Sequence, residues 1–140
     1  IGDVIAVAVD GSESSPAALR WAAAQAQARD VRLRVISVWE RVTWSTGVRV
    51  VDPDQSDAER ALAMLRASVE EAVPEAADRI EYRPVHAEEH VASHIVDAAE
   101  GAGLLVMGSR GRGGFTGLLL GSVSQRCLEA STIPVAIIRS

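Results

Sequence analysis

Apolar, β-branched runs alternate along this chain with segments of helical periodicity, and this alternation restricts the fold more than any other feature. The first run, Val4–Val9, is followed by the turn signal Asp10-Gly11-Ser12 and then by an alanine-rich segment. A second run, residues 104 to 107, ends in Gly108. Runs without polar alternation are typical of strands covered on both faces. Strands that alternate with helices predict an α/β fold with a parallel sheet built from right-handed βαβ units.

The same patterns predict five strands and four helices in one domain. The further strands are residues 31 to 39, with Leu33, Val35 and Val38 as core candidates, then Ile80–His86 and residues 134 to 138. The first helix is expected from the N-cap Ser15 to Arg29. The others are expected from residue 56 or 57 to 73, from 88 to 101, and over Ser122–Ala130. Residues 41 to 54, which include Trp44, are expected to form a long irregular connection.

Composition excludes several classes of function. The net charge of −5 argues against a nucleic-acid partner, which requires a basic face. The sequence has no apolar run of about eighteen residues, so no membrane span is expected. Its single cysteine fits a reducing compartment, and we expect a cytoplasmic protein. All 14 basic residues are arginine, which excludes a Walker-A loop and a protein kinase, because both need a lysine.

A glycine-rich segment points to a phosphate-bearing ligand. Gly108-Ser-Arg-Gly111 is followed, after nine residues, by Gly121-Ser122. The segment connects the second apolar run to a helix, at whose start Ser122 and Gln125 are predicted to form a capping box. Converging backbone N–H groups and the helix dipole favour phosphate there. A loop of this composition would on its own suit a flexible surface connection, but the flanking strand and helix favour phosphate binding.

Asp10 is the expected partner of this loop across the sheet. If the first and fourth strands are neighbours, both segments lie at the carboxyl edge where strand order reverses. Asp10 would then contact ribose hydroxyls, or phosphate through water or Mg²⁺, and Arg110 and Arg112 would neutralise phosphate charge. A plain Asx-turn at Asp10 is the alternative. A phosphatase Asp-x-Asp is excluded because Ala8 occupies the nucleophile position.

No metal site and no catalytic residue is expected. His90 and His94 are four residues apart on a predicted helix, but no third ligand follows at a recognisable spacing. We therefore interpret them as part of a solvated helix face. The chain also lacks any marked base for an attacking water, which favours a site that holds its ligand rather than one that reacts it.

These segments resemble the universal stress protein family, in its ATP-binding branch. The resemblance covers nearly the whole length. It is carried by Val-Ala-Val-Asp-Gly-Ser (residues 7 to 12), Leu-Leu-Val-Met-Gly-Ser-Arg-Gly (104 to 111), the spacing Gly-x2-Gly-x9-Gly-Ser, and Ile-Pro-Val (133 to 135). It implies a single five-stranded parallel sheet of order 3-2-1-4-5 with helices on both faces, the adenine nucleotide alpha hydrolase-like fold. Residues 1 to 140 would be one such domain, alone or as one unit of a tandem protein.

The resemblance also implies a ligand and a partner. ATP, with or without Mg²⁺, would be held between the ends of the first and fourth strands. Asp10 would contact the ribose, and the backbone at Val38 would hold the adenine. The phosphates and ribose would be lined by Met107, Gly108, Gly111, Gly121, Ser122, Val123 and Ser124. Members commonly form homodimers by pairing their last strands, here Val135–Ile138. One departure is Ala87-Glu88-Glu89-His90, where the family usually has Gly-x-Pro.

The sequence thus predicts an ATP-binding regulatory protein of stress physiology. Two alternatives stay open. One is a slow ATPase or an enzyme that phosphorylates itself on Ser122, Ser124 or Thr116. The other is a dimeric interaction module that binds no nucleotide. Because the loop recognises phosphate and the base contacts are with the backbone, ATP is not separated from ADP, AMP or a cyclic nucleotide.

Overall fold

A five-stranded parallel sheet forms the centre of the molecule. The structure is a computed structural model, and it describes residues 3–9, 15–39, 42–45, 48–51, 55–86, 90–109 and 121–139. The strands lie in the order β5-β2-β1-β6-β7. They are β1 (Val4–Val9), β2 (Arg32–Trp39), β5 (Ile80–His86), β6 (Leu104–Gly108) and β7 (Val135–Ile138). Numbered along the chain within this sheet, the order is 3-2-1-4-5, which confirms the predicted topology.

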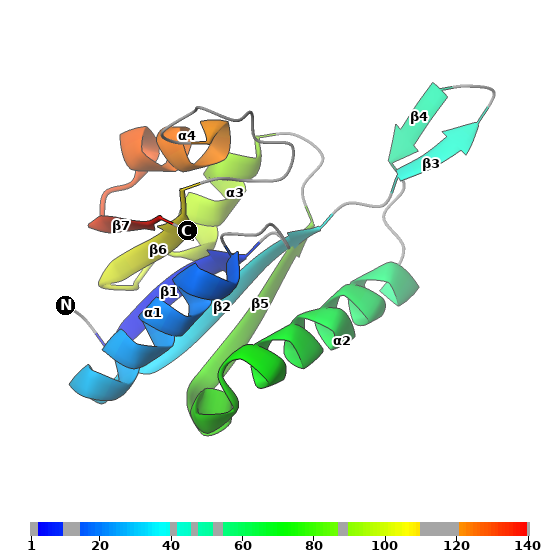
Figure 1. Ribbon diagram of the computed structural model, residues 1–140. Helices are drawn as coiled ribbons and strands as arrows, with labels where there is room; N and C mark the ends of the chain where they lie inside the picture. Colours follow the sequence, from blue (N-terminus) through cyan, green and yellow to red (C-terminus); the bar gives the residue numbers. More distant parts are fainter. Residues whose placement is uncertain are drawn as a thin grey trace.

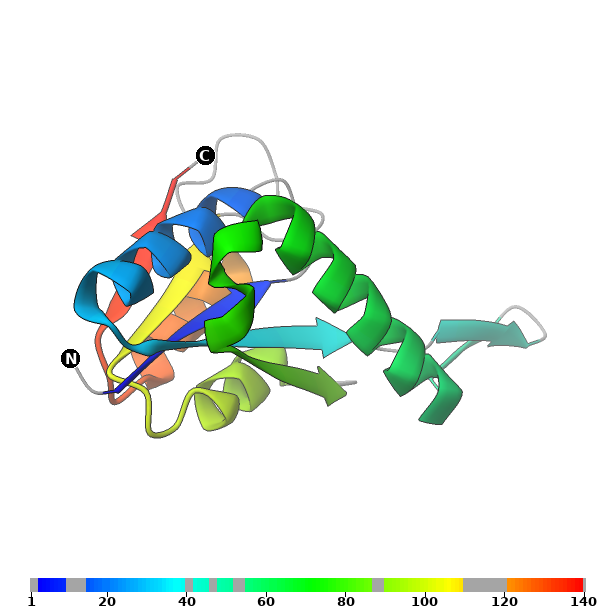
Figure 2. The ribbon, with the colours of Figure 1, turned by 90° about the horizontal axis from the view of Figure 1, so that it is seen from below.

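Two pairs of helices cover the two faces of the sheet (Figures 1 and 2). On one face lie α1 (Ser15–Arg29) and α2 (Gln55–Ala72), and the 3-10 helix η1 (Pro74–Arg79) leads from α2 into β5. On the other face lie α3 (Val91–Ala98) and α4 (Ser122–Ala130). The bounds of α4 are those predicted, whereas α3 is shorter than the expected residues 88 to 101.

The apolar runs supply a separate core on each face. Because successive residues of a strand point to opposite sides, the wholly buried Ile5, Ala6 and Val7 of β1 serve both cores. The α1/α2 core contains Leu33 and Val35, as predicted, together with three side chains that α2 and the residue after it contribute: Leu65, Val69 and Val73. The α3/α4 core contains Ala6, Ile36, Leu105, Met107, Ala92, Ile95 and Cys127.

The expectation of an irregular connection over residues 41 to 54 is wrong for its central part. There β3 (Val42–Ser45) and β4 (Val48–Val51) pair antiparallel and form a hairpin that projects beyond the end of the sheet (Figure 1). Valine, threonine and tryptophan favour extended backbone in these two short runs, and the glycine between them in the sequence is a turn signal. The length of the connection favours a loop, but in these two runs the local β-propensity prevails.

In the part of the chain that the structure describes, no helix has both the length and the apolar character needed to cross a membrane.

Candidate functional site

Strands β1 and β6 separate at their carboxyl ends. Their register runs from Ile5↔Leu104 to Val7↔Val106 and stops there. The last residues of β1 continue to pair with β2, as in Val9↔Ser37. The last residues of β6 continue to pair with β7, as in Gly108↔Ile138. The sheet therefore opens between β1 and β6, at the point where strand order reverses, which is where ligands of open α/β sheets bind.

The two ends of the glycine-rich segment are joined at the edge of this opening. The backbone N–H of Gly121 donates a hydrogen bond of 2.7 Å to the carbonyl of Ser109. The hydroxyl of Ser124 donates to the carbonyl of Gly108 over 2.9 Å. Ser109 in turn donates its N–H to the carbonyl of Ile138, at 2.9 Å. The start of α4, the end of β6 and the end of β7 are thus tied together, which defines the loop base: Gly108, Ser109, Gly121 and Ser124.

The predicted capping box at the start of α4 is wrong. The N-cap is Gly121, in extended backbone with φ −67° and ψ 157°, and no side chain caps the helix. Ser122 is the first helical residue, and the Gln125 N–H bonds the carbonyl of Gly121 at 2.9 Å. The hydrogen bond from the Gly121 N–H to the Ser109 carbonyl holds the chain where it enters the helix, and the cap stands one residue earlier than predicted.

Without a side-chain cap, the start of α4 has N–H groups that no described residue uses. Among the residues that the structure describes, none accepts a hydrogen bond from the N–H groups of Ser122, Val123 or Ser124. The first turn contains no acidic residue, so no carboxylate of α4 occupies the positive end of its dipole. Three N–H groups and a helix N-terminus beside an opened sheet are the donor set that a phosphate or another anion requires.

The structure places several of the predicted site residues at this edge. Gly108 ends β6, Gly121 and Ser124 are buried in the loop base, and Ser122 is exposed on the first turn of α4. Met107 and Val123 pack into the α3/α4 core, so their side chains face the protein interior. Val38 lies near the end of β2, paired with Val85 of β5, on the far side of β1 from the loop base. Asp10, Gly111, Arg110, Arg112, Thr116 and residues 87–89 lie outside the described residues.

Ser109 is the member of the loop base that sequence reasoning missed. Ser109 is 5% exposed, and it acts through its backbone N–H and carbonyl, which every residue type except proline possesses. The available signal was its position alone, directly after a buried strand and second in the Gly-Ser-Arg-Gly motif.

The remaining polar groups of the described chain do not form a second site of this kind. No group of three or more His, Cys, Asp or Glu residues within it is placed to hold a metal ion. Cys127 is wholly buried, and burial raises the pKa of its thiol to about 11. A hollow of about 240 Å³ lies between α1 and η1, lined by Ala23, Ala26, Gln27, Leu33, Glu75, Ala76 and Arg79. Leu33 and Arg79 lie at the amino ends of β2 and β5, so this hollow is at the opposite edge from the loop base.

The fold and the opening between β1 and β6 define a doubly wound α/β domain of the adenine nucleotide alpha hydrolase-like class. Residues 3–139 match the model of the universal stress protein family, and the chain belongs to this family.

Relatives of known name agree with this assignment. A universal stress protein of Mycolicibacterium smegmatis is 35% identical over 136 residues, which are 96% of this chain and 45% of the relative. A solved family member from Burkholderia pseudomallei is 28% identical, with a TM-score of 0.69 over 99% of this chain and 96% of that one. A universal stress protein solved in complex with cAMP is 26% identical, with a TM-score of 0.67 over 99% and 97%. The chain spans about half the length of the curated relatives that it matches.

Proposed function

We propose that this chain is an ATP-binding regulatory protein of the stress response, which holds its nucleotide between the carboxyl ends of β1 and β6. The observation that carries the proposal is the loop base. It brings the end of β6 to the uncapped start of α4, whose first three N–H groups have no acceptor among the described residues. Phosphate oxygens are suitable acceptors for these groups.

The family and the cAMP complex support an adenine nucleotide in particular. The related protein with cAMP is similar to this chain over nearly its whole length, and cAMP combines an adenine with one phosphate. In our proposal the backbone near Val38 contacts the adenine, Asp10 the ribose, and Gly108, Gly111, Gly121 and residues 122–124 the phosphates, with Mg²⁺ accompanying ATP. The tandem arrangement and a cytoplasmic location stay predictions.

Nucleotide release and thermal shift test the proposal. Purified protein is heat-denatured and the supernatant analysed by mass spectrometry, and the melting temperature is measured with ATP–Mg²⁺, ADP, AMP and cAMP. At a hundredfold excess over Kd, a ligand that binds only the folded state stabilises it by about 2.7 kcal/mol. For a domain of this size we expect a rise in Tm of about 5–10 °C. No released nucleotide and no shift with any of the four would sink the proposal.

The variant Gly121→Val tests the location of the site. Its side chain would stand at the start of α4, beside the N–H groups proposed to hold phosphate, and we expect nucleotide binding to be lost. Ala130→Val places the same side chain on the exposed last residue of the same helix and should bind as wild type. Circular dichroism must show both variants folded. Equal affinities in the two variants would place the nucleotide elsewhere.

Asp10→Ala tests the proposed ribose contact separately. We expect weaker ATP binding with an unchanged fold, because a polar residue that follows a strand in the sequence contributes little to the core. Wild-type affinity in this variant would remove Asp10 from the site and leave the phosphate contacts in place.

We further propose a homodimer through β7. This strand lies at one edge of the sheet, and β5 lies at the other. Pro84 within β5 has no N–H to donate, which discourages pairing at that edge. The residues Val135–Ile138 include no proline or charge, so β7 is the edge better suited to pair with a second copy.

A further inference from the structure

A charged side chain is buried in the middle of the sheet, away from the loop base. Arg34 of β2 is 9% exposed, and among the residues whose burial the structure describes no other charged one is buried. Its neighbours Leu33 and Val35 belong to the α1/α2 core, so Arg34 points to the opposite face, toward α3. A guanidinium in such a place needs partners, because burying an unpaired charge is strongly unfavourable.

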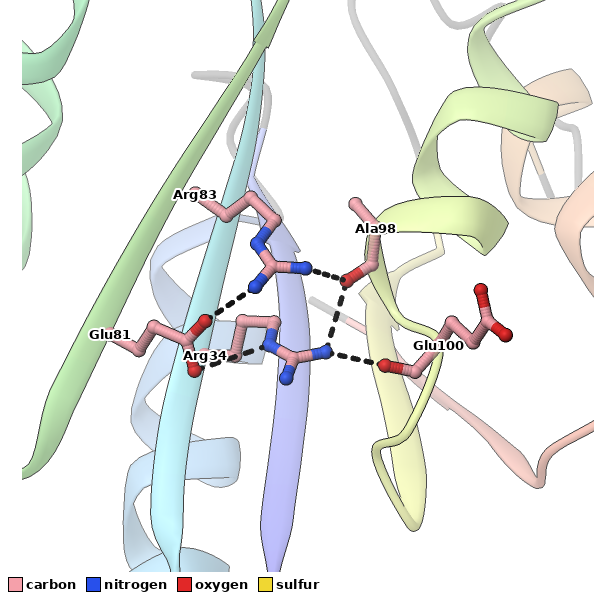
Figure 3. Close-up of polar contacts among 5 residues, drawn as sticks. All are labelled: Arg34, Glu81, Arg83, Ala98 and Glu100. Carbon is pink, nitrogen blue, oxygen red and sulfur yellow. Dashed lines mark hydrogen bonds and ion pairs between the residues drawn. The ribbon is translucent and has the colours of Figure 1, made fainter.

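Its partners come from β5 and from the end of α3 (Figure 3). The Arg34 Nε lies 3.4 Å from Glu81 Oε2, an ion pair without a hydrogen bond. The Arg34 Nη1 donates to the carbonyls of Ala98, at 3.1 Å, and Glu100, at 2.8 Å. Arg83 donates through Nη2 to Glu81 Oε1, at 2.6 Å, and through Nη1 to the same Ala98 carbonyl, at 3.3 Å. We call Arg34, Glu81 and Arg83 the latch.

The latch supplies what the carboxyl end of α3 lacks. The last carbonyls of a helix have no partner within it, and this end of the dipole favours positive charge. The last turn of α3 contains no basic residue. The carbonyls of Ile95 and Asp97 accept from Ala99 and Glu100. The carbonyls of Ala98 and Glu100 accept hydrogen bonds from the two guanidinium groups instead. The sheet therefore holds the end of α3 through these side chains.

From α3 a series of contacts leads to the loop base. Ala92 and Ile95 of α3 pack with Cys127 of α4 in one core, and the Cys127 thiol donates weakly to the carbonyl of Ala92 at 3.8 Å. One turn earlier on α4, Ser124 donates to the carbonyl of Gly108. Because close-packed side chains transmit displacement, a shift of α3 along the sheet would move the start of α4 relative to β6.

We propose that Arg34, Glu81 and Arg83 are positioning residues for the nucleotide site, which act from the amino ends of the strands by fixing α3 and, through it, α4. This inference rests on the proposed function. It differs from a purely structural role in one respect: loosening the latch changes the geometry of the loop base in a molecule that is still folded.

Nucleotide affinity in folded variants tests this step. The variants are Glu81→Gln and Arg83→Gln, whose side chains are 31% and 41% exposed and tolerate substitution better than Arg34. Arg79→Gln is the matched control, because it breaks an exposed ion pair with Asp30 that does not involve α3. With mant-ATP as the probe, at a temperature where circular dichroism shows every variant folded, we expect Kd to rise about 2- to 30-fold in the two latch variants. Arg79→Gln should stay within twofold of wild type, and Arg83→Lys should recover part of the loss.

Hydrogen exchange without nucleotide provides the second readout. We expect the amides of α4 to exchange faster in Glu81→Gln than in wild type or in Arg79→Gln. Faster exchange confined to α3 and β5, with unchanged Kd, would overturn the inference and leave the latch a structural feature. If wild-type protein binds no nucleotide, the proposed function fails by itself. Exchange in α4 then still decides whether the latch controls the loop base.

Discussion

Ser124 is the residue at which the local fold and the proposed ligand compete for one hydroxyl proton. Ser124 is 4% exposed, and its Oγ donates to the carbonyl of Gly108. A serine hydroxyl has a single proton to donate, so it cannot serve this carbonyl and a phosphate at once. The residue therefore acts in the loop base as a brace between α4 and β6, while its backbone N–H remains for an anion.

The variant Ser124→Ala tests this division of roles. It leaves the carbonyl of Gly108 without the hydroxyl, and we expect the free energy of unfolding in urea to fall by about 1–3 kcal/mol. Nucleotide affinity should fall less than in Gly121→Val. Ser122→Ala, on the exposed residue two positions earlier, is the control and should change stability little. Wild-type stability with strongly weakened binding would mean that the hydroxyl serves the ligand instead.

Cys127 should be chemically inert in the folded protein. It is wholly buried, and burial raises the pKa of the thiol to about 11, while the thiolate is the reactive form. At pH 8 we expect negligible reaction with Ellman's reagent over minutes, and complete reaction after addition of urea. Because the chain has one cysteine, the signal needs no assignment. Native protein that reacts at the rate of a free thiol would contradict the closed packing of α3 on α4.

At the scale of elements, strand β7 has an inner edge, which bonds to β6, and an outer edge, and the hydrogen bonds show which residues belong to each. The carbonyls of Pro134 and Ile138 accept hydrogen bonds from Leu105 and Ser109, both at 2.9 Å. Since backbone groups of alternate residues point to opposite edges of a strand, Val135 and Ile137 face outward. Ile137→Pro therefore removes a donor that a second copy would use without removing a bond to β6.

We expect Ile137→Pro to be a folded monomer when wild type is a dimer, as measured by light scattering after size exclusion. Ala136→Pro is the matched control on the inner edge. It removes a donor to β6 and should destabilise the fold by about 1–3 kcal/mol, because a buried acceptor loses its partner. A dimer that persists in folded Ile137→Pro would assign the interface to another surface.

The elements also show how far the sequence was informative. Every strand of the main sheet was predicted, because apolar runs such as Val4–Val9 do not show the periodicity of an amphipathic helix. The hairpin of β3 and β4 was not, since its two strands have four residues each, too short for periodicity to outweigh a loop. The capping box failed for a tertiary reason. Gly121 is fixed by Ser109, twelve residues earlier, and this contact decides where α4 begins.

For the whole molecule, topology was predictable and the latch was not. Order 3-2-1-4-5 follows from alternating strands and helices together with the family resemblance. The burial of Arg34 depends instead on Glu81 in β5 and on Ala98, 64 residues later in the chain. In the sequence, Arg34 reads as the polar member of an alternating strand. The Arg34 side chain is buried because α3 packs over it, and its counter-charge comes from β5.

The latch gives the whole molecule a defined response to acid. Burial by itself raises the pKa of Glu81, but the guanidinium groups of Arg34 and Arg83 outweigh burial and hold the pKa below its ordinary value of 4.5. A carboxyl whose pKa is lower in the folded state contributes stability at pH values above 4.5. That contribution is lost as the pH falls below 4.5 and through the folded-state pKa.

Urea unfolding of wild type and Glu81→Gln at pH 6 and pH 3 separates this group from the other carboxyls. At pH 6 we expect the variant to be less stable by about 1.5–3 kcal/mol, because two guanidinium groups lose their counter-charge. At pH 3 the difference in the free energy of unfolding between wild type and Glu81→Gln should be smaller by about 1 kcal/mol. The change is small because Glu81 is partly exposed and screened by solvent. Asp30→Asn, in the exposed ion pair with Arg79, should differ less from wild type in the free energy of unfolding at both pH values. If the difference in the free energy of unfolding between wild type and Glu81→Gln is the same at the two pH values, the carboxyl is not held ionised by the latch. The stability of the sheet and α3 then rests on packing alone.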